Sequence, residues 1–587
     1  MKILLTALNA KYIHSSLALR SLTEYCHGLA GGLLNIETAE FTINNEKSFI
    51  LSEIYSKSPD VIGFSCYIWN INMILDIASN LKKVMPKTII FLGGPEVSFD
   101  SDKLLKDYPF IDFIIRGEGE KAFYNTARRL ASGSTDLTDI KGLTFRNEGE
   151  IIISPPENEL PPDEIPFAYK SLNDMENRII YYESQRGCPY NCQFCLSSID
   201  GHVRFLSERR TKSDLDFFLS NNVRQVKFVD RTFNCNKEHA HFIWQYLMQN
   251  DNGQTNFHME IEAHILDDSE IEFLRRARKG LFQFEIGVQS TNTGTLACVS
   301  RSSDFDTLKS KVLKIKEGKN IHVHLDLIAG LPHEDYESFK KSFNDVYSLR
   351  PEQLQLGFLK LLKGSGLRRD AEKYGIVYDG KAPYEVLYTK EIDFTHMLRL
   401  KAIEEMVETY YNSFKLINTE RYVSQLFDTP FDMYEQLADY WRKNLYHTVN
   451  HSKQELYNIF YDFCSENKNT AGQIRTVKDL LKFDMLLSDN IKTFPDFAQE
   501  NISDELKNKK RRFFNTPENI HKYLPKLLSY TPAQISRMCR IEYFDYDVFS
   551  FAKHEATALN RRPCYVLYNY FDRDIITNHS SYSKIDI

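Results

Sequence analysis

Residues Glu183–Cys195 read Glu-Ser-Gln-Arg-Gly-Cys-Pro-Tyr-Asn-Cys-Gln-Phe-Cys and hold three cysteines in the spacing C-x3-C-x2-C. These are Cys188, Cys192 and Cys195. Such close spacing allows three thiolates to converge on one metal site. The apolar run Ile179–Ser184 leads into the motif and predicts a β-strand. We therefore expect a metal-binding loop at the carboxyl end of a strand.

Two kinds of metal site agree with this motif. A tetrahedral zinc ion would need a fourth ligand, and His202 is the nearest candidate in the sequence. A [4Fe–4S] cluster held by three thiolates instead leaves one iron open to a further ligand. The remaining interpretation, three buried cysteines with no shared role, is disfavoured by the spacing. The seven other cysteines are scattered along the 587 residues, so a total of ten does not indicate a disulfide scaffold.

The segment around the motif, residues 179–375, alternates between strand-like and helix-like stretches. Its strand candidates are Ile179–Ser184, Gln225–Val229, Phe257–Ile261, Gln283–Val288, Val323–Ala329 and Gln353–Phe358. Six such units with helices between them predict a partial (β/α)6 barrel. The active site of a barrel of this kind lies at the carboxyl ends of its strands.

Residues 1–150 alternate in the same way. Their strand candidates are Lys2–Ala7, Glu37–Ile43, Asp60–Cys66, Thr88–Gly93 and Asp112–Arg116. Five strands with helices between them predict an α/β domain with an open, doubly wound parallel sheet of the Rossmann or flavodoxin-like type. Ligands of such sheets bind beyond the carboxyl ends of the strands, where Ser65–Tyr67, Gly93–Glu96 and Gly117–Glu120 stand.

A proline-rich stretch over residues 151–178 separates these two regions, and we interpret it as a linker. Its prolines are Pro155, Pro156, Pro161, Pro162 and Pro166. The third region, residues 376–587, has a different character and predicts a mostly helical C-terminal domain. Its expected helices are Glu391–Phe414, Pro430–Tyr446, Ser452–Asn467 and Thr476–Leu487, and the strand-like runs Ile541–Phe551 and Pro563–Phe571 follow.

Composition excludes several classes of protein. Lys and Arg number 73 against 80 Asp and Glu, which gives a net charge of −7 and makes nucleic acid an unlikely partner. The basic run Lys507–Phe514 could meet RNA, but we favour a solvated turn beside a helix. No apolar run reaches the roughly 20 residues that a membrane span needs. Met1–Ala7 predicts a first strand and not a signal peptide, so we expect a cytoplasmic protein.

The cysteine motif, with the aromatic Phe194 before its last cysteine, resembles the signature of radical S-adenosylmethionine (SAM) enzymes. Later stretches also resemble motifs of that family, namely Phe228–Asn234, His258–Glu262, Glu285–Ser290 and Asp326–Pro332. The resemblance implies that Cys188, Cys192 and Cys195 bind a [4Fe–4S] cluster whose fourth iron is chelated by SAM. The SAM contacts that it implies are Phe194, Asp230, Arg231, Glu260, Gln289, Ser290, Ile328 and Gly330. A Gly-Gly-Glu motif that often follows the second strand is absent, and Asp230 and Arg231 occupy its place.

The doubly wound domain before the barrel resembles the cobalamin-binding class of radical SAM enzymes. The runs Val61–Tyr67, Phe91–Glu96 and Ile115–Glu120 carry this resemblance. The cobalamin contacts that it implies are Ser65, Tyr67, Gly93, Gly94, Glu96, Gly117, Glu118 and Gly119. The motif Asp-x-His-x-x-Gly is absent, and only His14 matches it, so we expect no axial ligand from His14. The arrangement is also similar to a branch of this class with a C-terminal domain of unknown function.

These resemblances imply an enzyme with three cofactors, a [4Fe–4S] cluster, SAM and cobalamin. The expected reaction is cleavage of SAM to a 5′-deoxyadenosyl radical and methylation of an unactivated carbon through methylcobalamin. Radical rearrangement, cyclisation or oxidation without methyl transfer is the first alternative. An iron–sulfur or zinc module that regulates is the second. The substrate is not identified by the sequence, and an external electron donor of the flavodoxin or ferredoxin type is implied.

Overall fold

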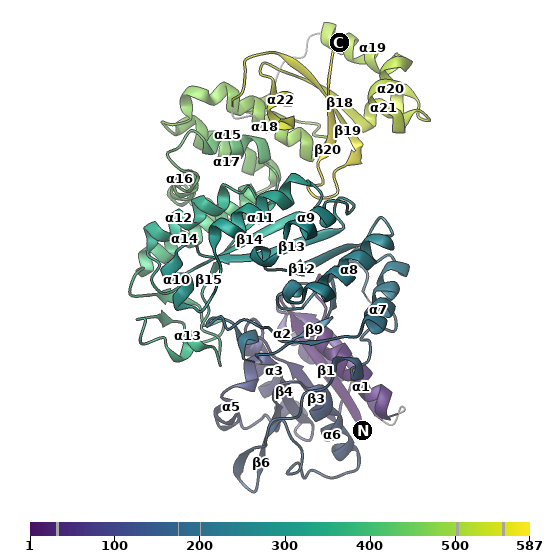
Figure 1. Ribbon diagram of the computed structural model, residues 1–587, viewed down its shortest axis with the longest axis vertical. Coiled ribbons are helices and arrows are strands. Elements are labelled where there is room, and N and C mark those ends of the chain that lie inside the picture. Colours follow the sequence, from purple (N-terminus) through teal and green to yellow (C-terminus); the bar gives the residue numbers. More distant parts are fainter. Residues whose placement is uncertain (31–33, 174, 200, 500–503, 555–557) are drawn as a thin grey trace. The chain divides into compact units, whose positions relative to one another are not determined.

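The computed structural model describes residues 1–30, 34–173, 175–199, 201–499, 504–554 and 558–587 (Figure 1). These residues form two compact units. The first unit comprises Met1–Val323, Ile328–Asp335 and Gly357–Phe394. The second comprises His324–Leu327, Tyr336–Leu356 and Thr395–Ile587. Within the described residues, no helix is long and apolar enough to cross a membrane.

The N-terminal part of the first unit is a seven-stranded sheet of order β2-β1-β3-β4-β5-β6-β7. Its strands are β1 (Lys2–Asn9), β2 (Asn35–Thr42), β3 (Val61–Ser65), β4 (Ile89–Gly93), β5 (Phe113–Ile115), β6 (Leu143–Asn147) and β7 (Glu150–Ile153). Strands β1 to β5 are parallel, as the sequence predicts.

Strands β6 and β7 form an antiparallel hairpin at the edge of this sheet and were not predicted. Their turn is Asn147-Glu148-Gly149-Glu150, and both central residues have positive φ, 49° at Glu148 and 86° at Gly149. Two such residues are typical of the tight hairpin turns that match strand twist. The sequence Glu148-Gly149 therefore already indicated a turn. Strand β7 includes the first residues of the stretch that we interpreted as a linker.

Helices cover both faces of the sheet, so the doubly wound architecture is confirmed (Figure 1). They are α1 (Leu17–Ala30), α2 (Lys47–Ser56), α3 (Ile71–Val84), α4 (Pro95–Ser98), α5 (Ser101–Asp107) and α6 (Glu120–Ala131). One face buries Leu19 of α1 and Phe123 of α6, and the other buries Ile54 of α2 and Ile74 of α3. Burial of apolar side chains on both faces is what makes the central strands almost wholly apolar.

The second sheet has six strands in the order β15-β14-β13-β12-β11-β8, which confirms the partial barrel. The strands are β8 (Ile180–Tyr182), β11 (Gln225–Phe228), β12 (Asn256–Glu260), β13 (Phe282–Gln289), β14 (His322–Ala329) and β15 (Gln353–Phe358). The accompanying helices are α7 (Glu208–Ser220), α8 (Lys237–Gln249), α9 (Asp268–Leu274), α10 (Thr293–Cys298), α11 (Phe305–Glu317) and α12 (Tyr336–Tyr347). Strands β8, β11, β12 and β13 are parallel neighbours.

A short segment follows β15 in the first unit and contains α13 (Gly366–Arg369), β16 (Val377–Tyr378) and β17 (Val386–Tyr388). The helices beyond it are α14 (Phe394–Met406), α15 (Ile417–Ser424), α16 (Pro430–Lys443), α17 (Lys453–Glu466), α18 (Ile474–Ser488), α19 (Asp504–Asn515), α20 (Pro517–Tyr523), α21 (Pro532–Met538) and α22 (Val548–Lys553). A three-stranded antiparallel sheet consists of β18 (Cys539–Phe544), β19 (Cys564–Arg573) and β20 (Ser580–Ile585).

Two expectations for this C-terminal region were wrong. The run Ile541–Phe551 is a strand only up to Phe544, because Asp547 caps a new helix by accepting the backbone N–H of Ser550 at 3.2 Å. The run Lys507–Phe514 is not a turn, because it lies within α19. Its phenylalanines, Phe513 and Phe514, are buried in a local core, which explains why two aromatic residues follow the basic ones.

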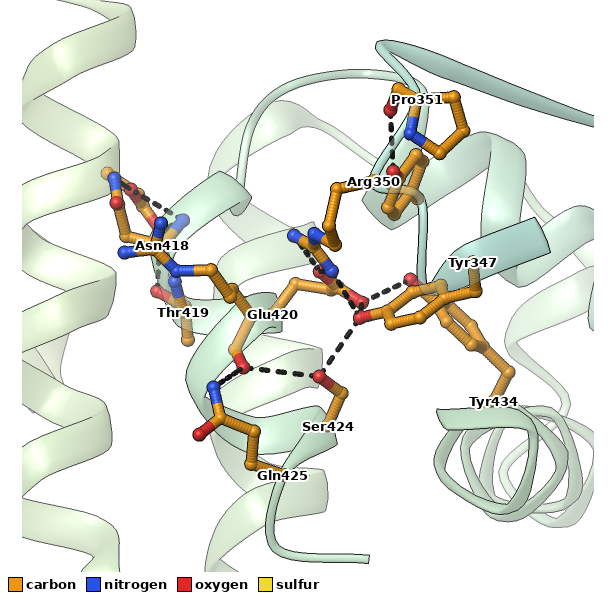
Figure 2. A network of polar contacts seen from close by, with 12 residues as sticks. Tyr347, Arg350, Pro351, Asn418, Thr419, Glu420, Ser424, Gln425 and Tyr434 are labelled. Carbon is orange, nitrogen blue, oxygen red and sulfur yellow. Dashed lines mark hydrogen bonds and ion pairs between the residues drawn. The ribbon is translucent and has the colours of Figure 1, made fainter. Parts of the chain in front are cut away.

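A buried polar network holds the second unit together around Glu420 of α15 (Figure 2). Both guanidinium Nη atoms of Arg350 lie 3.1 Å from Glu420 Oε2. The hydroxyls of Tyr434, at 2.8 Å, and Tyr347 donate to Oε1. Glu420 is only 1% exposed, so its charge is stabilised inside the protein by these partners and not by water.

Candidate functional site

The three cysteines of the motif lie on the loop that follows β8. Strand β9 (Gln185–Arg186) pairs antiparallel with β10 (Arg204–Phe205) and brings the chain back beside the loop. Cys188 and Cys192 are 8% and 7% exposed, and Cys195 is partly exposed. The loop therefore presents three thiols at the carboxyl end of the first barrel strand, where the sequence predicts them.

A glycine makes the approach to the first cysteine possible. Gly187 has a φ of 98°, and a side-chain Cβ added there would lie 1.9 Å from the carbonyl oxygen of His202. Only glycine fits, because any other side chain would collide with backbone. The imidazole of His202, the candidate fourth zinc ligand, is exposed and has its Nε2 2.8 Å from Glu159 Oε2.

Asp230, after β11, binds the start of the cysteine loop. Its carboxylate accepts the backbone N–H of Ser184 at 2.8 Å and that of Gln185 at 3.1 Å, and it also accepts the Ser184 hydroxyl. The Ser184 hydroxyl lies 3.1 Å from Nε2 of His239. Asp230 is fully buried, and burial raises its pKa to about 8. Although predicted to contact SAM, its carboxylate thus supports the loop backbone.

The surroundings of the thiols fit a cluster with sulfur ligands. The hydroxyl of Thr232 lies 3.7 Å from Cys188 Sγ, and Nη1 of Arg301 lies 3.8 Å from Cys192 Sγ. Burial raises the pKa of the Cys192 thiol, whereas the positive charge of Arg301 lowers it. Hydrogen bonds to sulfur and a nearby cation are features that stabilise and tune iron–sulfur clusters. The donor set of three cysteines in one loop therefore fits a [4Fe–4S] cluster.

Two further residues predicted to contact SAM form an ion pair at the rim of the barrel. Nη1 of Arg231 lies 3.0 and 2.9 Å from the two carboxylate oxygens of Glu260. The Arg231 side chain is 52% exposed and that of Glu260 is 26% exposed. An accessible guanidinium beside an accessible carboxylate is complementary to the zwitterionic end of an amino acid.

The other predicted SAM contacts lie near the carboxyl ends of β13 and β14. Gln289 ends β13 with a φ of 68°, and Gly330 follows β14 with a φ of 88°. Ser290 is buried and donates its hydroxyl to Glu334 at 2.5 Å. Ile328 lies in β14, and Phe194 is partly buried in the cysteine loop. These positions agree with a binding edge, and their contacts with SAM stay predictions.

The inner face of the barrel strands is polar. Register aligns Tyr181 of β8, Lys227 of β11 and His258 of β12 on neighbouring strands. Glu285 of β13 lies 2.9 Å from Lys227 Nζ and 2.9 Å from His258 Nε2. The alternate residues of these strands, such as Phe228 and Phe284, are fully buried beneath the helices. A polar inner face differs from the apolar layers that fill a closed barrel, and it leaves the interior suited to a polar ligand.

A cavity of about 750 Å³ lies between the N-terminal sheet and the cysteine loop. Residues after β1 and β3 contribute to its wall, including His14, Tyr67 and Trp69. The rings of Tyr67 and Trp69 stack 4.3 Å apart, and Trp69 Nε1 donates to the carbonyl of Leu8 at 3.2 Å. His14 Nδ1 lies 2.7 Å from the hydroxyl of Tyr181.

The residues predicted to contact cobalamin fall into two groups. Tyr67, Glu118 and Gly119 line the cavity. Those outside the described cavity lining are Ser65, Gly93, Gly94, Glu96 and Gly117. The predicted residues thus lie at the edge of the sheet that borders this cavity, but only some of their loops face it, and their contacts with cobalamin stay predictions.

The loop after β4 is used for packing within the unit. Glu96 is 2% exposed, with Lys363 Nζ 2.9 Å and the Tyr384 hydroxyl 2.5 Å from its Oε1. A Cβ added to Gly94 would lie 2.6 Å from the carbonyl oxygen of Cys66. Only glycine fits at position 94, because the loop after β4 contacts the backbone of the loop after β3 there.

The loop after β5 is joined to the cysteine loop by ion pairs. Arg186, two residues before Cys188, has Nη2 2.6 Å from Glu120 Oε1 and Nη1 3.3 Å from Glu118 Oε2. Arg204, which faces Arg186 across the β9–β10 pair, also binds Glu118. Burial raises the pKa of Glu120, but the Arg186 charge reverses this effect and leaves the pKa lowered.

Two elements of the site were not predicted. The proline-rich stretch interpreted as a linker contributes Pro162, Phe167 and Tyr169 to the wall of the cavity. Arg301, beside Cys192, comes from a segment 109 residues further along the chain. The sequence carried a signal for the first, because Phe167 and Tyr169 closely follow the last of its prolines, whereas nothing marked Arg301 among the other arginines.

Three family models match the chain in succession. A B12 binding domain matches residues 3–127, the radical SAM superfamily matches residues 182–346, and a protein family of unknown function, DUF4080, matches residues 372–568. The DUF4080 match covers most of the helical C-terminal region.

Among curated proteins, the cobalamin-dependent radical SAM methyltransferase TokK of Streptomyces tokunonensis is 25% identical over 341 residues, which is 54% of this chain and 50% of TokK. The 2-(S-pantetheinyl)-carbapenam-3-carboxylate methyltransferase of Streptantibioticus cattleyicolor is 25% identical over 307 residues, 49% of this chain and 45% of that protein. The chain thus spans about half the length of these curated relatives.

Among solved structures, the cobalamin-dependent SAM radical enzyme OxsB with aqua-cobalamin and SAM bound has a TM-score of 0.60 at 15% identity. The match covers 87% of this chain and 83% of OxsB, and at this identity it supports the fold. The N-terminal sheet, the partial barrel and the helical C-terminal region follow one another in the order in which the family models match. The chain therefore matches a B12 binding domain, the radical SAM superfamily and DUF4080 in succession, and it is similar to cobalamin-dependent radical SAM enzymes.

Proposed function

We propose that this protein is a radical SAM enzyme that uses cobalamin to methylate an unactivated carbon of a polar substrate. The observation that carries the proposal is the position of the three-cysteine loop, between a polar barrel interior and a 750 Å³ cavity walled by the B12-binding domain. The similarity to TokK, which is named as a cobalamin-dependent radical SAM methyltransferase, and to a second methyltransferase supports it.

The chain's own residues would hold three groups. Cys188, Cys192 and Cys195 would bind a [4Fe–4S] cluster, with the loop kept in shape by Asp230. Arg231 and Glu260 would hold the carboxylate and ammonium of SAM. The cavity between the N-terminal sheet and the cysteine loop would hold cobalamin.

When bound, these groups would supply the chemistry, because a reduced cluster cleaves SAM to a 5′-deoxyadenosyl radical and methylcobalamin provides a methyl group. The protein would orient the substrate carbon and exclude water from the site. The stacked rings of Tyr67 and Trp69 offer a flat apolar surface for a large planar ligand. A flavodoxin- or ferredoxin-type donor in a reducing, cytoplasmic compartment would supply electrons.

The first experiment separates an enzyme from a metal-binding regulator. The protein is reconstituted anaerobically with iron and sulfide, given SAM and dithionite, and assayed for 5′-deoxyadenosine. We expect product from the wild type and none above background from Cys192→Ala. Equal output from the two proteins would contradict the proposed radical chemistry.

The second experiment separates methyl transfer from rearrangement, cyclisation or oxidation. Hydroxocobalamin is added to the same reaction with a reductant that yields cob(I)alamin, and S-adenosylhomocysteine is measured. Methyl transfer from SAM to cobalamin produces S-adenosylhomocysteine, whereas the alternatives produce 5′-deoxyadenosine alone. Binding of well under one cobalamin per chain at saturation would contradict the methylcobalamin route.

A further inference from the structure

A buried arginine lies against one of the three cysteines. Nη1 of Arg301 is 3.8 Å from Sγ of Cys192, and the Arg301 side chain is only 10% exposed. The backbone N–H of Gln193, the residue after Cys192, donates to the carbonyl of Val299 at 3.0 Å. The segment that carries Arg301 is thus attached to the cysteine loop by its backbone as well as by its side chain.

The guanidinium is fixed in this position by two acceptors. Its Nη2 binds the carboxylate of Glu262 and lies 2.5 Å from the carbonyl oxygen of Gly287. Glu262 has a side chain that is 8% exposed, and His264 Nδ1 lies 3.0 Å from its Oε2. Backbone hydrogen bonds of 2.9 Å between Glu262 and the side chain of Asn234 fix this carboxylate in turn.

Charges this close to a redox centre change its reduction potential. Reduction adds one electron, so a nearby cation and an N–H donor to sulfur favour the reduced form, and a nearby carboxylate disfavours it. Both effects are larger in a buried site, where water screens charges poorly.

We infer that Arg301 raises the reduction potential of the cluster bound by the three cysteines and that Glu262 limits this rise. The inference rests on the proposed function, since it requires that the cluster forms. Arg301 and Glu262 are then positioning residues that act through Cys192. Removal of the Arg301 charge and removal of the Glu262 charge should therefore shift the reduction potential in opposite directions. An ion pair that acts only on stability predicts no such difference in sign.

The test compares reconstituted wild-type protein with Arg301→Gln, Arg301→Lys and Glu262→Gln. Arg275→Gln is the matched control, because Arg275 pairs with Glu272 and Glu317 on the surface of the first unit. Iron and sulfide are measured first, and each protein is then titrated anaerobically against redox mediators while the reduced cluster is followed by electron paramagnetic resonance.

We expect Arg301→Gln to lower the midpoint potential and Glu262→Gln to raise it. Arg301→Lys keeps the charge and should fall between Arg301→Gln and wild type, and Arg275→Gln should equal wild type. Shifts of the same sign in Arg301→Gln and Glu262→Gln, or no shift beyond the control, overturn the inference while leaving the proposed function intact. If Arg301→Gln holds too little cluster to titrate, Glu262→Gln decides alone, and a potential at or below wild type overturns the inference. A wild type that binds no cluster overturns both.

Discussion

Oδ1 of Asp230 accepts the backbone N–H of Ser184 at 2.8 Å, and this contact ties the end of the second barrel strand to the start of the cysteine loop. Both residues are fully buried. Asp230 occupies the place where radical SAM enzymes often have a Gly-Gly-Glu motif, and its carboxylate accepts backbone N–H groups of the loop. This contact fixes the backbone at Ser184, four residues before Cys188.

The Asp230 contact predicts that loss of this carboxylate weakens cluster binding. Asp230→Ala leaves the backbone donors of Ser184 and Gln185 unpaired in a buried site, at a cost of about 1–3 kcal/mol each. We expect the iron content after reconstitution to fall to less than half of the wild-type value. The exposed Asp216→Asn serves as control, and equal iron content in all three proteins would show that the loop holds its shape without Asp230.

The two groups of predicted cobalamin residues should differ in binding experiments. Tyr67→Ala removes one ring of the stacked pair in the cavity wall, and we expect hydroxocobalamin affinity to fall roughly tenfold, or about 1.4 kcal/mol. Glu96→Gln should leave affinity within about twofold of wild type, because Glu96 is held by Lys363 and Tyr384. Equilibrium dialysis measures both, and a larger loss in Glu96→Gln than in Tyr67→Ala would contradict the assignment of the cavity.

The stability of the second unit should depend on pH through Asp479. Its carboxylate accepts the backbone N–H groups of Asp545 at 2.8 Å and Tyr546 at 3.1 Å, and burial raises its pKa to about 6. The native state therefore binds more protons than the unfolded state, whose aspartate pKa is about 3.9. This contribution to stability is full below pH about 4 and is lost as pH rises through about 6.

Asp479→Asn removes this dependence, because asparagine does not titrate. The free energy of unfolding of wild type minus that of the variant should fall between pH 4.5 and pH 7.5, by about 2 kcal/mol. Urea titrations at a series of pH values measure the difference, with the exposed Asp439→Asn as control. A difference that is constant or rises with pH would be incompatible with the raised pKa.

The network around Glu420 predicts a large loss of stability on substitution. Glu420→Ala leaves the buried Arg350 charge without its carboxylate, and breaking a buried ion pair costs about 3–5 kcal/mol. Asp489→Asn removes the partner of Lys453 in an exposed pair and should cost no more than about 1 kcal/mol. Urea unfolding monitored by circular dichroism compares the two, and similar costs would mean that the Glu420 network contributes little.

The sequence predicts the fold well where local pattern and burial agree. All five parallel strands of the first sheet and all six of the barrel lie where apolar runs predict them. The metal-binding loop could be predicted equally well, because the spacing of its three cysteines indicates a shared metal site. The hairpin of β6 and β7 was missed although Glu148-Gly149 marks its turn, because short edge strands with charged residues give a weak apolar pattern.

The individual side chains of the site were harder to predict. Asp230 and Glu96 stand at the expected carboxyl ends of strands, but both are taken up by hydrogen bonds within the protein. Arg301 is joined to Cys192 only by the way the chain folds, and no spacing rule connects positions 109 residues apart. Position along a strand can be read from one sequence, whereas the partner of a side chain is decided by three-dimensional packing.

The contact between Arg350 and Glu420 has a consequence for how this chain can be divided. The radical SAM match ends at residue 346 and the DUF4080 match begins at residue 372, so Arg350 belongs to neither. In the structure, Tyr336–Leu356 folds with the C-terminal helices. A fragment cut at the family boundary would bury Glu420 without its cation. The residues matched by the DUF4080 model are therefore fewer than the residues that fold together as the second unit. A chimera that exchanges the C-terminal region must include α12 and β15.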